Sequence, residues 1–297
     1  MEYAIGIIIG SLLGLTGAGG SVFAVPLLML LLNLSATEAM GTALCAVALS
    51  ACYGVIVQHK RVLWAPAFIL VAGGMLMAPL GKWLSLDVPD VWLMCGFNVL
   101  ALFIAVRMWH QSVVDPTATE ITRASSPLDT SAISQSTPCR YSDDGVFHLK
   151  PKCLSRLVLG GLLIGLISGV FGVGGGFLIV PFLLFVSPIP MRAAVATSLF
   201  AITLISASGF AAHVYFVQGL ASAALSVPLA EQVGDLAFGD MLVGGLNAAL
   251  LIKIMLSAVV GMILSQALSA YIAGPRLQRV FAVLLVAVSL FTLVWKI

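Results

Sequence analysis

The sequence predicts an all-α integral membrane protein made of two homologous helical repeats of about four transmembrane segments each, with the first segment of each repeat broken at a glycine-rich turn. Composition is the first observation behind this prediction. Of the 297 residues, 61% are hydrophobic and only 9% are charged, and the mean hydropathy is +1.13. A soluble globule of this size needs more polar surface than that. The second observation is an internal duplication.

The duplication is a glycine-rich sequence followed by a proline, and its two copies lie 155 positions apart. The first copy contains Gly10, Gly14, Gly17, Gly19, Gly20 and Pro26, and the second contains Gly165, Gly169, Gly172, Gly174, Gly175 and Pro181. The same offset also pairs Thr42 with Thr197 and Gly54 with Gly209. Both copies are therefore expected to share a second helix as well.

Eight apolar stretches are expected to form the helices, and a barrel is excluded because its short alternating segments are absent. They lie near 3 to 34, 39 to 57, 62 to 81, 91 to 109, 154 to 187, 192 to 217, 241 to 271 and 278 to 296. Most reach the roughly 20 residues that a helical span needs. Residues 5 to 34 as one straight helix would run about 45 Å, well beyond a hydrocarbon core of about 30 Å. The excess length predicts a break at the glycines.

These patterns divide the chain into a first repeat (1–109), a polar linker (110–153) and a second repeat (154–297). The linker is rich in Pro, Ser and Thr, which is typical of a tether. Past Gly219 the internal match resumes at an offset near 186, so the second repeat carries an insertion near 220–250, expected to be interfacial or re-entrant. Four full crossings would make the repeats parallel, whereas an added re-entrant element would invert the second. The sequence leaves both open.

Charge and cysteines exclude several classes. A net charge of +2 argues against nucleic acid as a partner. If every apolar stretch crosses once, Lys60, Arg61 and most other basic residues share a side with the N terminus, so the positive-inside rule predicts cytoplasmic termini. The cysteine spacings indicate neither a metal site nor a disulfide.

The dense glycine runs predict a site for an anion. They consist of Gly17, Gly19, Gly20 and Ser21 in the first copy and Gly172, Gly174, Gly175 and Gly176 in the second. Exposed amides in such turns form a concave nest, and a helix starting near Pro26 or Pro181 would add the positive end of its dipole. Negative charge is then bound without a buried Lys or Arg. Gly10, Gly14, Gly165 and Gly169, spaced by four, are instead expected to pack helices together.

Several polar residues lie at the ends of the apolar stretches or within them. The hydroxyls of Thr42, Thr197 and Ser198 would either complete an anion cage or bond their own helix backbone. Ser35 and Glu38 form a capping-box pattern before an apolar run. His213 is expected to be structural rather than a proton relay.

The segment Gly14-Leu-Thr-Gly17-Ala-Gly19-Gly20-Ser21 with Pro26, together with its partner Gly169-Val-Phe-Gly172-Val-Gly174-Gly175-Gly176 with Pro181, resembles the paired signatures of the TauE/SafE sulfite exporter family. That family consists of bacterial and plant permeases for sulfite, sulfonates and other sulfur-containing or organic anions. The resemblance implies anion transport.

The function expected is a secondary transporter that moves a small anion by alternating access, with one half of the protein rocking against the other. An anion channel and a non-transporting membrane scaffold are the alternatives. No nucleophile, nucleotide-binding or zinc motif is present, so neither an enzyme nor a cofactor is expected. The expected partners are the small anion, the lipid bilayer and a coupling ion that nothing identifies. A homodimer remains open, and the bacterial plasma (inner) membrane is the expected location.

Overall fold

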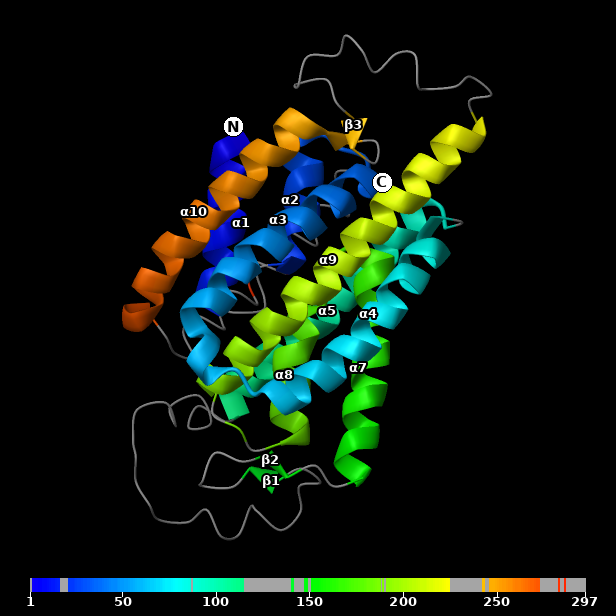
Figure 1. The fold of residues 1–297 in the computed structure, drawn as a ribbon. Coiled ribbons are helices and arrows are strands. Elements are labelled where there is room, and N and C mark those ends of the chain that lie inside the picture. The colour runs from blue at the N-terminus through cyan, green and yellow to red at the C-terminus, as the bar shows by residue number, and fades with distance from the viewer. Residues whose placement is uncertain are drawn as a thin grey trace.

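The computed structural model describes residues 2–16, 21–86, 88–114, 140–141, 147–148, 151–187, 189, 191–224, 242–243, 246–272, 283 and 286. These residues are helical apart from short connections and two pairs of two-residue strands. The first half contains α1 (Glu2–Thr16), α2 (Ser21–Leu32), α3 (Ala36–Gln58), the 3-10 helix η1 (His59–Arg61), α4 (Trp64–Leu86) and α5 (Asp90–Val114). The second half contains α7 (Pro151–Phe171), α8 (Gly176–Val186), α9 (Met191–Ala224) and α10 (Ala248–Ile272) (Figure 1). The antiparallel strand pairs are β1 (Arg140–Tyr141) with β2 (Phe147–His148), and β3 (Leu242–Val243) with β4 (Leu246–Asn247).

Five helices in the described part are long and apolar enough to cross a membrane. Their spans are Thr37–Arg61, Trp64–Leu86, Cys153–Phe171, Ala193–Phe216 and Ala248–Gln266. α1 and α2 are apolar but shorter, as is α8 with its 11 residues. Short apolar helices need neighbours that cover their ends, because hydrocarbon offers no hydrogen-bond partners.

Helices α4 and α7 pack backbone to backbone through small residues. A Cβ added to Gly165 would fall on the carbonyl oxygen of Gly74, and one added to Gly169 would fall on the carbonyl of Ala78. Gly81 approaches the backbone of Val170 in the same way. Such close approach is the usual basis of membrane-helix association, which confirms the packing role predicted for Gly165 and Gly169.

Helices α1 and α10 form a second pair of the same kind. A Cβ on Gly10 would fall on the carbonyl of Ala258, and a Cβ on Gly261 would fall on that of Ile7. Ser265 Oγ donates a hydrogen bond of 2.7 Å to the Ser11 carbonyl oxygen, which fixes the register. The first helix of each half thus packs against a later helix of the other half: α1 against α10, and α7 against α4 (Figure 1).

The register of these contacts gives the direction of each helix. Gly6 meets Ser257 while Gly14 meets Ser265, so α1 and α10 are parallel. Contacts of Cys45 with Met255 and of Gly54 with Met262 make α3 parallel to α10 as well.

The remaining long helices run the other way. Gly41 contacts His213 and Gly54 contacts Leu199, so α9 is antiparallel to α3. Helix α4 is parallel to α9, because Phe68 lies against Phe200 and the carbonyl of Met75 accepts a hydrogen bond from Ser208. Since α7 is parallel to α4 by the glycine contacts above, α1 and α7 run in opposite directions.

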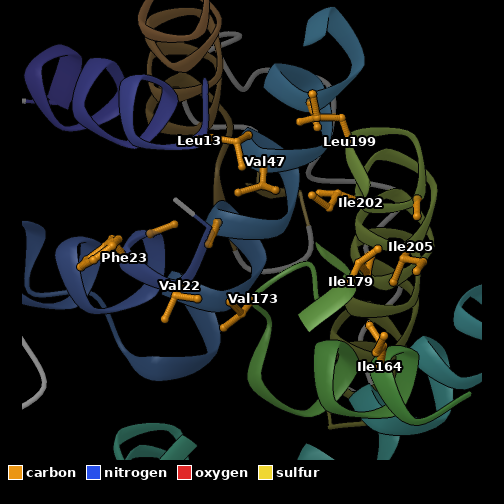
Figure 2. Close-up of a cluster of buried hydrophobic side chains, with 14 of the residues drawn as sticks. Leu13, Val22, Phe23, Val47, Ile164, Val173, Ile179, Leu199, Ile202 and Ile205 are labelled. Atoms are coloured by element: carbon orange, nitrogen blue, oxygen red, sulfur yellow. The ribbon is translucent and has the colours of Figure 1, made fainter. Parts of the chain in front are cut away.

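The core combines apolar side chains from both halves. Leu13, Phe23 and Val47 come from the first half, and Ile179 and Ile202 come from the second; all five belong to one buried cluster (Figure 2). Pro26 and Pro181 lie inside α2 and α8 rather than at their starts, because the helices begin five residues earlier than expected, at Ser21 and Gly176.

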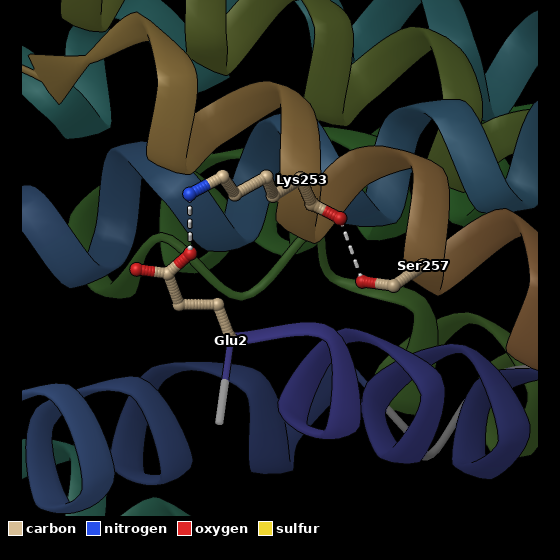
Figure 3. A network of polar contacts seen from close by, with 3 residues as sticks. All are labelled: Glu2, Lys253 and Ser257. Carbon is tan, nitrogen blue, oxygen red and sulfur yellow. Dashed lines mark hydrogen bonds and ion pairs between the residues drawn. The ribbon is translucent and has the colours of Figure 1, made fainter.

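Two polar contacts secure helix ends. The predicted capping box is confirmed: Ser35 Oγ accepts from the Glu38 amide, while the Glu38 carboxylate accepts from the Ser35 amide at 2.9 Å. Lys253, on α10, forms an ion pair of 3.1 Å with Glu2 at the start of α1, and its carbonyl accepts from Ser257 (Figure 3). Lys253 therefore has a carboxylate partner.

Three boundaries or bonds differ from expectation. Cys153, at the start of α7, is disulfide-bonded with a partner outside the described residues, which corrects the expectation of no disulfide. Sequence spacing missed it because the bond depends on how the chain folds between its cysteines. Helix α5 continues to Val114, and α9 continues to Ala224. Most of the linker and the insertion near 220–250 lies outside the described residues.

We expect Gly165→Ala to destabilise the protein, because its methyl group would have to displace the Gly74 backbone. Overpacking of this kind costs about 1–3 kcal/mol. Gly209→Ala is the matched control, since a Cβ there would lie 3.5 Å from Leu44, an ordinary contact. Thermal unfolding of the detergent-purified protein, followed by tryptophan fluorescence, compares the two. Equal midpoints would contradict the close approach of α4 and α7.

Candidate functional site

The connection between α7 and α8 is a turn that requires glycine. Gly172, Gly174 and Gly175 have φ of 65°, 73° and 65°. A side chain in this left-handed region costs roughly 1–2 kcal/mol, so the chain places residues without Cβ there. Gly175 is the N-cap of α8, and Gly176 is its first residue.

The turn lies deep in the protein. Val173 is 1% exposed, and the flanking residues from Gly172 to Gly176 are buried. A Cβ on Gly174 would lie 3.2 Å from Val47 and 3.6 Å from Ile202. Both of these residues sit near the middle of their membrane spans. The turn therefore lies close to mid-depth of the two central helices, α3 and α9.

The turn presents backbone donors. In the part of the chain that the structure describes, the amides of Val173, Gly174, Gly175 and Gly176 have no hydrogen-bond acceptor. The Gly172 amide, in contrast, donates to the Ser168 carbonyl at 2.9 Å. Buried amides are nearly always paired. Four unpaired amides in succession at the N-terminus of a helix have the geometry of known anion-binding turns in proteins.

The first-copy glycines cannot be compared directly. Gly17, Gly19 and Gly20 lie outside the described residues, between the end of α1 at Thr16 and the start of α2 at Ser21. Ser21 is fully buried. Helix α2, which it begins, contacts α8.

The predicted hydroxyl residues are buried, but the structure does not bring them together. Thr42 Oγ1 donates to the Glu38 carbonyl at 2.9 Å, and Ser198 Oγ donates to that of Val195 at 2.8 Å, as helix hydroxyls commonly do. Thr197 Oγ1 accepts from the Leu63 amide at 3.0 Å. Because α3 and α9 are antiparallel, Thr42 and Thr197 lie on the order of 20 Å apart along the helix axes. One cage cannot contain both.

Sequence reasoning missed two serines beside the turn. Ser206 and Ser168 are 0% and 1% exposed, and neither hydroxyl has a hydrogen-bond partner among the described residues. A Cβ on Gly174 would lie 2.5 Å from Ser206 Oγ, so this hydroxyl is directed at the turn. A signal was present: at the 155 offset these serines correspond to Ala51 and Leu13, so both depart from the internal repeat.

Lys82 is a buried cation that the sequence placed outside the apolar stretches. It is 2% exposed because α4 continues to Leu86. Its neighbour Gly81 packs against α7 beside Gly169, shortly before the glycine turn. The protein therefore buries a lysine within the span from Trp64 to Leu86.

His213 is fully buried on α9 and packs on Gly41 of α3. A Cβ on Gly41 would lie 2.5 Å from Nε2 of the ring, so the missing side chain of Gly41 makes room for the imidazole. This packing fits the structural role predicted for His213.

The chain matches the model of a known family. The family model described as Sulfite exporter TauE/SafE matches residues 3–292. No solved structure matches the chain.

Three relatives carry the same general description. The chain is 27% identical over 296 residues to a "Probable membrane transporter protein" of Xylella fastidiosa (strain Temecula1), covering 97% of this chain and 92% of the relative. It is 30% identical over 214 residues to the protein so named in strain 9a5c, covering 69% and 71%. It is also 26% identical over 223 residues to "Probable membrane transporter protein YunE" of Bacillus subtilis, covering 70% and 76%.

We expect Ser206→Ala to leave the stability of the protein unchanged or to raise it by about 1 kcal/mol, since it removes a buried hydroxyl that has no partner. Thr197→Val, in contrast, leaves the Leu63 amide unpaired and should destabilise by about 1–2 kcal/mol. Thermal unfolding in detergent measures both. A clear loss of stability in Ser206→Ala would mean that the hydroxyl is bonded within the protein.

Proposed function

Because the chain belongs to the TauE/SafE sulfite exporter family, we propose that it is a secondary transporter that moves a small anion, such as sulfite, a sulfonate or a related sulfur-containing or organic anion, by alternating access. The relatives are named as membrane transporters, and the chain is a membrane transporter with apolar spanning helices. An enzymatic role is not proposed.

The observation that carries the proposal is the row of buried, unpaired amides from Val173 to Gly176. N–H groups offer hydrogen to a ligand but no lone pair, so they favour an anion over a cation. The dipole of α8 adds positive potential at the same point.

Inverted repeats would support alternating access. The opposite directions of α1 and α7 are what inversion of the second repeat requires. Equivalent residues also make reciprocal contacts: Gly54 faces Leu199, and Gly209 faces Leu44, each residue being related to its counterpart by the 155 offset. In such transporters the substrate site lies at the interface of the repeats, at broken helices.

We propose that the site is formed by both glycine segments, with Gly172, Gly174, Gly175 and Gly176 on one side and Gly17, Gly19, Gly20 and Ser21 on the other. The proposed site leaves out Thr42, Thr197 and Ser198, because their hydroxyls form hydrogen bonds within the protein. The two threonines also lie near opposite ends of α3. The coupling ion is not assigned.

We propose that the protein lies in the bacterial plasma membrane with His59, Lys60 and Arg61 in the cytoplasm. These exposed residues form a basic turn at the end of α3, and the positive-inside rule favours that side. Because α1 and α3 are parallel, Glu2 is at the other end. We therefore propose an N terminus outside the cytoplasm, in place of the cytoplasmic N terminus expected if every apolar stretch crosses once.

The orientation can be tested by labelling. In right-side-out spheroplasts, a membrane-impermeant maleimide should react with Tyr3→Cys and not with Lys60→Cys, beyond the background of the native cysteines. Both positions are exposed. The reverse labelling pattern would mean that the N terminus is cytoplasmic.

The transport function can be tested with the full chain in liposomes and a panel of sulfite, sulfate, methanesulfonate and acetate. Uptake of at least one anion should saturate. Gly175→Ala should reduce its uptake about tenfold or more, because a side chain at φ 65° shifts the amide donors. Gly209→Ala serves as the control.

Other outcomes separate the alternatives. Flux that does not saturate, together with single-channel currents, would indicate a channel. If Gly175→Ala changes only the unfolding midpoint and no anion binds or moves, the protein is a scaffold. Movement of cations alone would disprove the role of the amides.

A further inference from the structure

We propose that Ser206 and Ser168 donate hydrogen bonds to the transported anion, so that the second half of the chain carries a hydroxyl-bearing, asymmetric part of the substrate site. This inference rests on the proposed function and goes beyond it. The glycine motifs supply backbone donors, whereas the two serines are side chains that no motif identifies.

Ser206 provides the more direct evidence. Its side chain is 0% exposed at the centre of α9, and its Oγ has no hydrogen-bond partner among the described residues. The hydroxyl lies on the side of Gly174 where a Cβ would be, 2.5 Å from that position. It therefore points at the segment whose amides also have no acceptor.

Ser168 reaches the same turn from α7. It is 1% exposed, and its Oγ likewise has no partner in the described part of the chain. Its Cβ lies 3.2 Å from the position that a Cβ on Gly175 would occupy, and its carbonyl accepts the Gly172 amide at 2.9 Å. The two serines thus flank consecutive glycines from different helices.

The shared chemistry of these groups determines the ligand class. A helix serine usually bonds a carbonyl in the preceding turn, as Ser50 does with Ala46 at 2.7 Å. Burying a hydroxyl without a partner is unfavourable, so two such hydroxyls beside four unpaired amides are unexpected in a merely structural element. All six groups can donate. An oxyanion, with several lone pairs on each oxygen, accepts from all of them.

The asymmetry follows from the internal repeat. The positions equivalent to Ser206 and Ser168 in the first half are Ala51 and Leu13, which carry no hydroxyl. The first half therefore offers no replacement when either serine is removed. We expect the second half to hold the anion through side chain and backbone together.

The test uses Ser206→Ala, Ser168→Ala and Ser187→Ala in the full chain. Ser187 is the matched control. It is buried as well, with 2% exposure, and its hydroxyl has no partner among the described residues, but it lies at the C-terminal end of α8, away from the turn. Sulfite and methanesulfonate are the probes, with binding measured by isothermal titration calorimetry in detergent and KM measured in liposomes. Because each variant only removes an unbonded hydroxyl, all three should fold.

We expect Ser206→Ala to raise the Kd and the KM for the bound probe about tenfold or more, which is typical of a lost hydrogen bond to a charged group. Ser168→Ala should act in the same direction, and Ser187→Ala should stay within about twofold of the parent. If the parent binds and transports a probe while Ser206→Ala and Ser168→Ala match Ser187→Ala, this inference is overturned and the proposed function stands. If the parent neither binds nor transports any probe, the proposed function itself fails.

Discussion

The architecture depends on one constraint: inside a bilayer, backbone N–H and C=O groups find no water and must be paired within the protein or reserved for a ligand. The long helices satisfy it internally. The turn from Gly172 to Gly175 does not, because its left-handed residues interrupt the helix and leave the amides from Val173 to Gly176 without acceptors in the described part of the chain. Such a segment persists only if its surroundings hold it in place and if its donors have another use.

The close packing of the helices around the turn also depends on glycine. Gly165 and Gly169 let α7 touch the backbone of α4, and Gly10 with Gly261 does the same for α1 and α10. Each pair joins helices from different halves. The first helix of each half is thereby attached to the other half, and movement of one half against the other would act directly on the segments that follow these helices.

The two halves are related but are not equal. Ser206 and Ser168, beside the second turn, have no hydroxyl at the equivalent positions of the first half. Lys82 is buried on α4, and the equivalent position in α10, at the 186 offset, is Leu268. Among the described residues, unpaired buried hydroxyls lower stability, so their place beside the turn is consistent with the binding role that we propose for them. The proposed site would combine a glycine motif that is duplicated in the sequence with side chains that are specific to one copy.

The helical membrane class, the packing glycines and the capping box could be predicted from the amino-acid sequence, because they depend on composition and on local spacing. The glycines that adopt positive φ could be located in the same way, since no other residue tolerates that conformation so readily. The direction of α1 relative to α7, the separation of Thr42 from Thr197 and the approach of Ser206 to Gly174 emerge only from the folded chain. Each of these results from contacts between segments far apart in the sequence, and residues such as Ser206 or Lys82 have no local pattern that reveals which helix they will face.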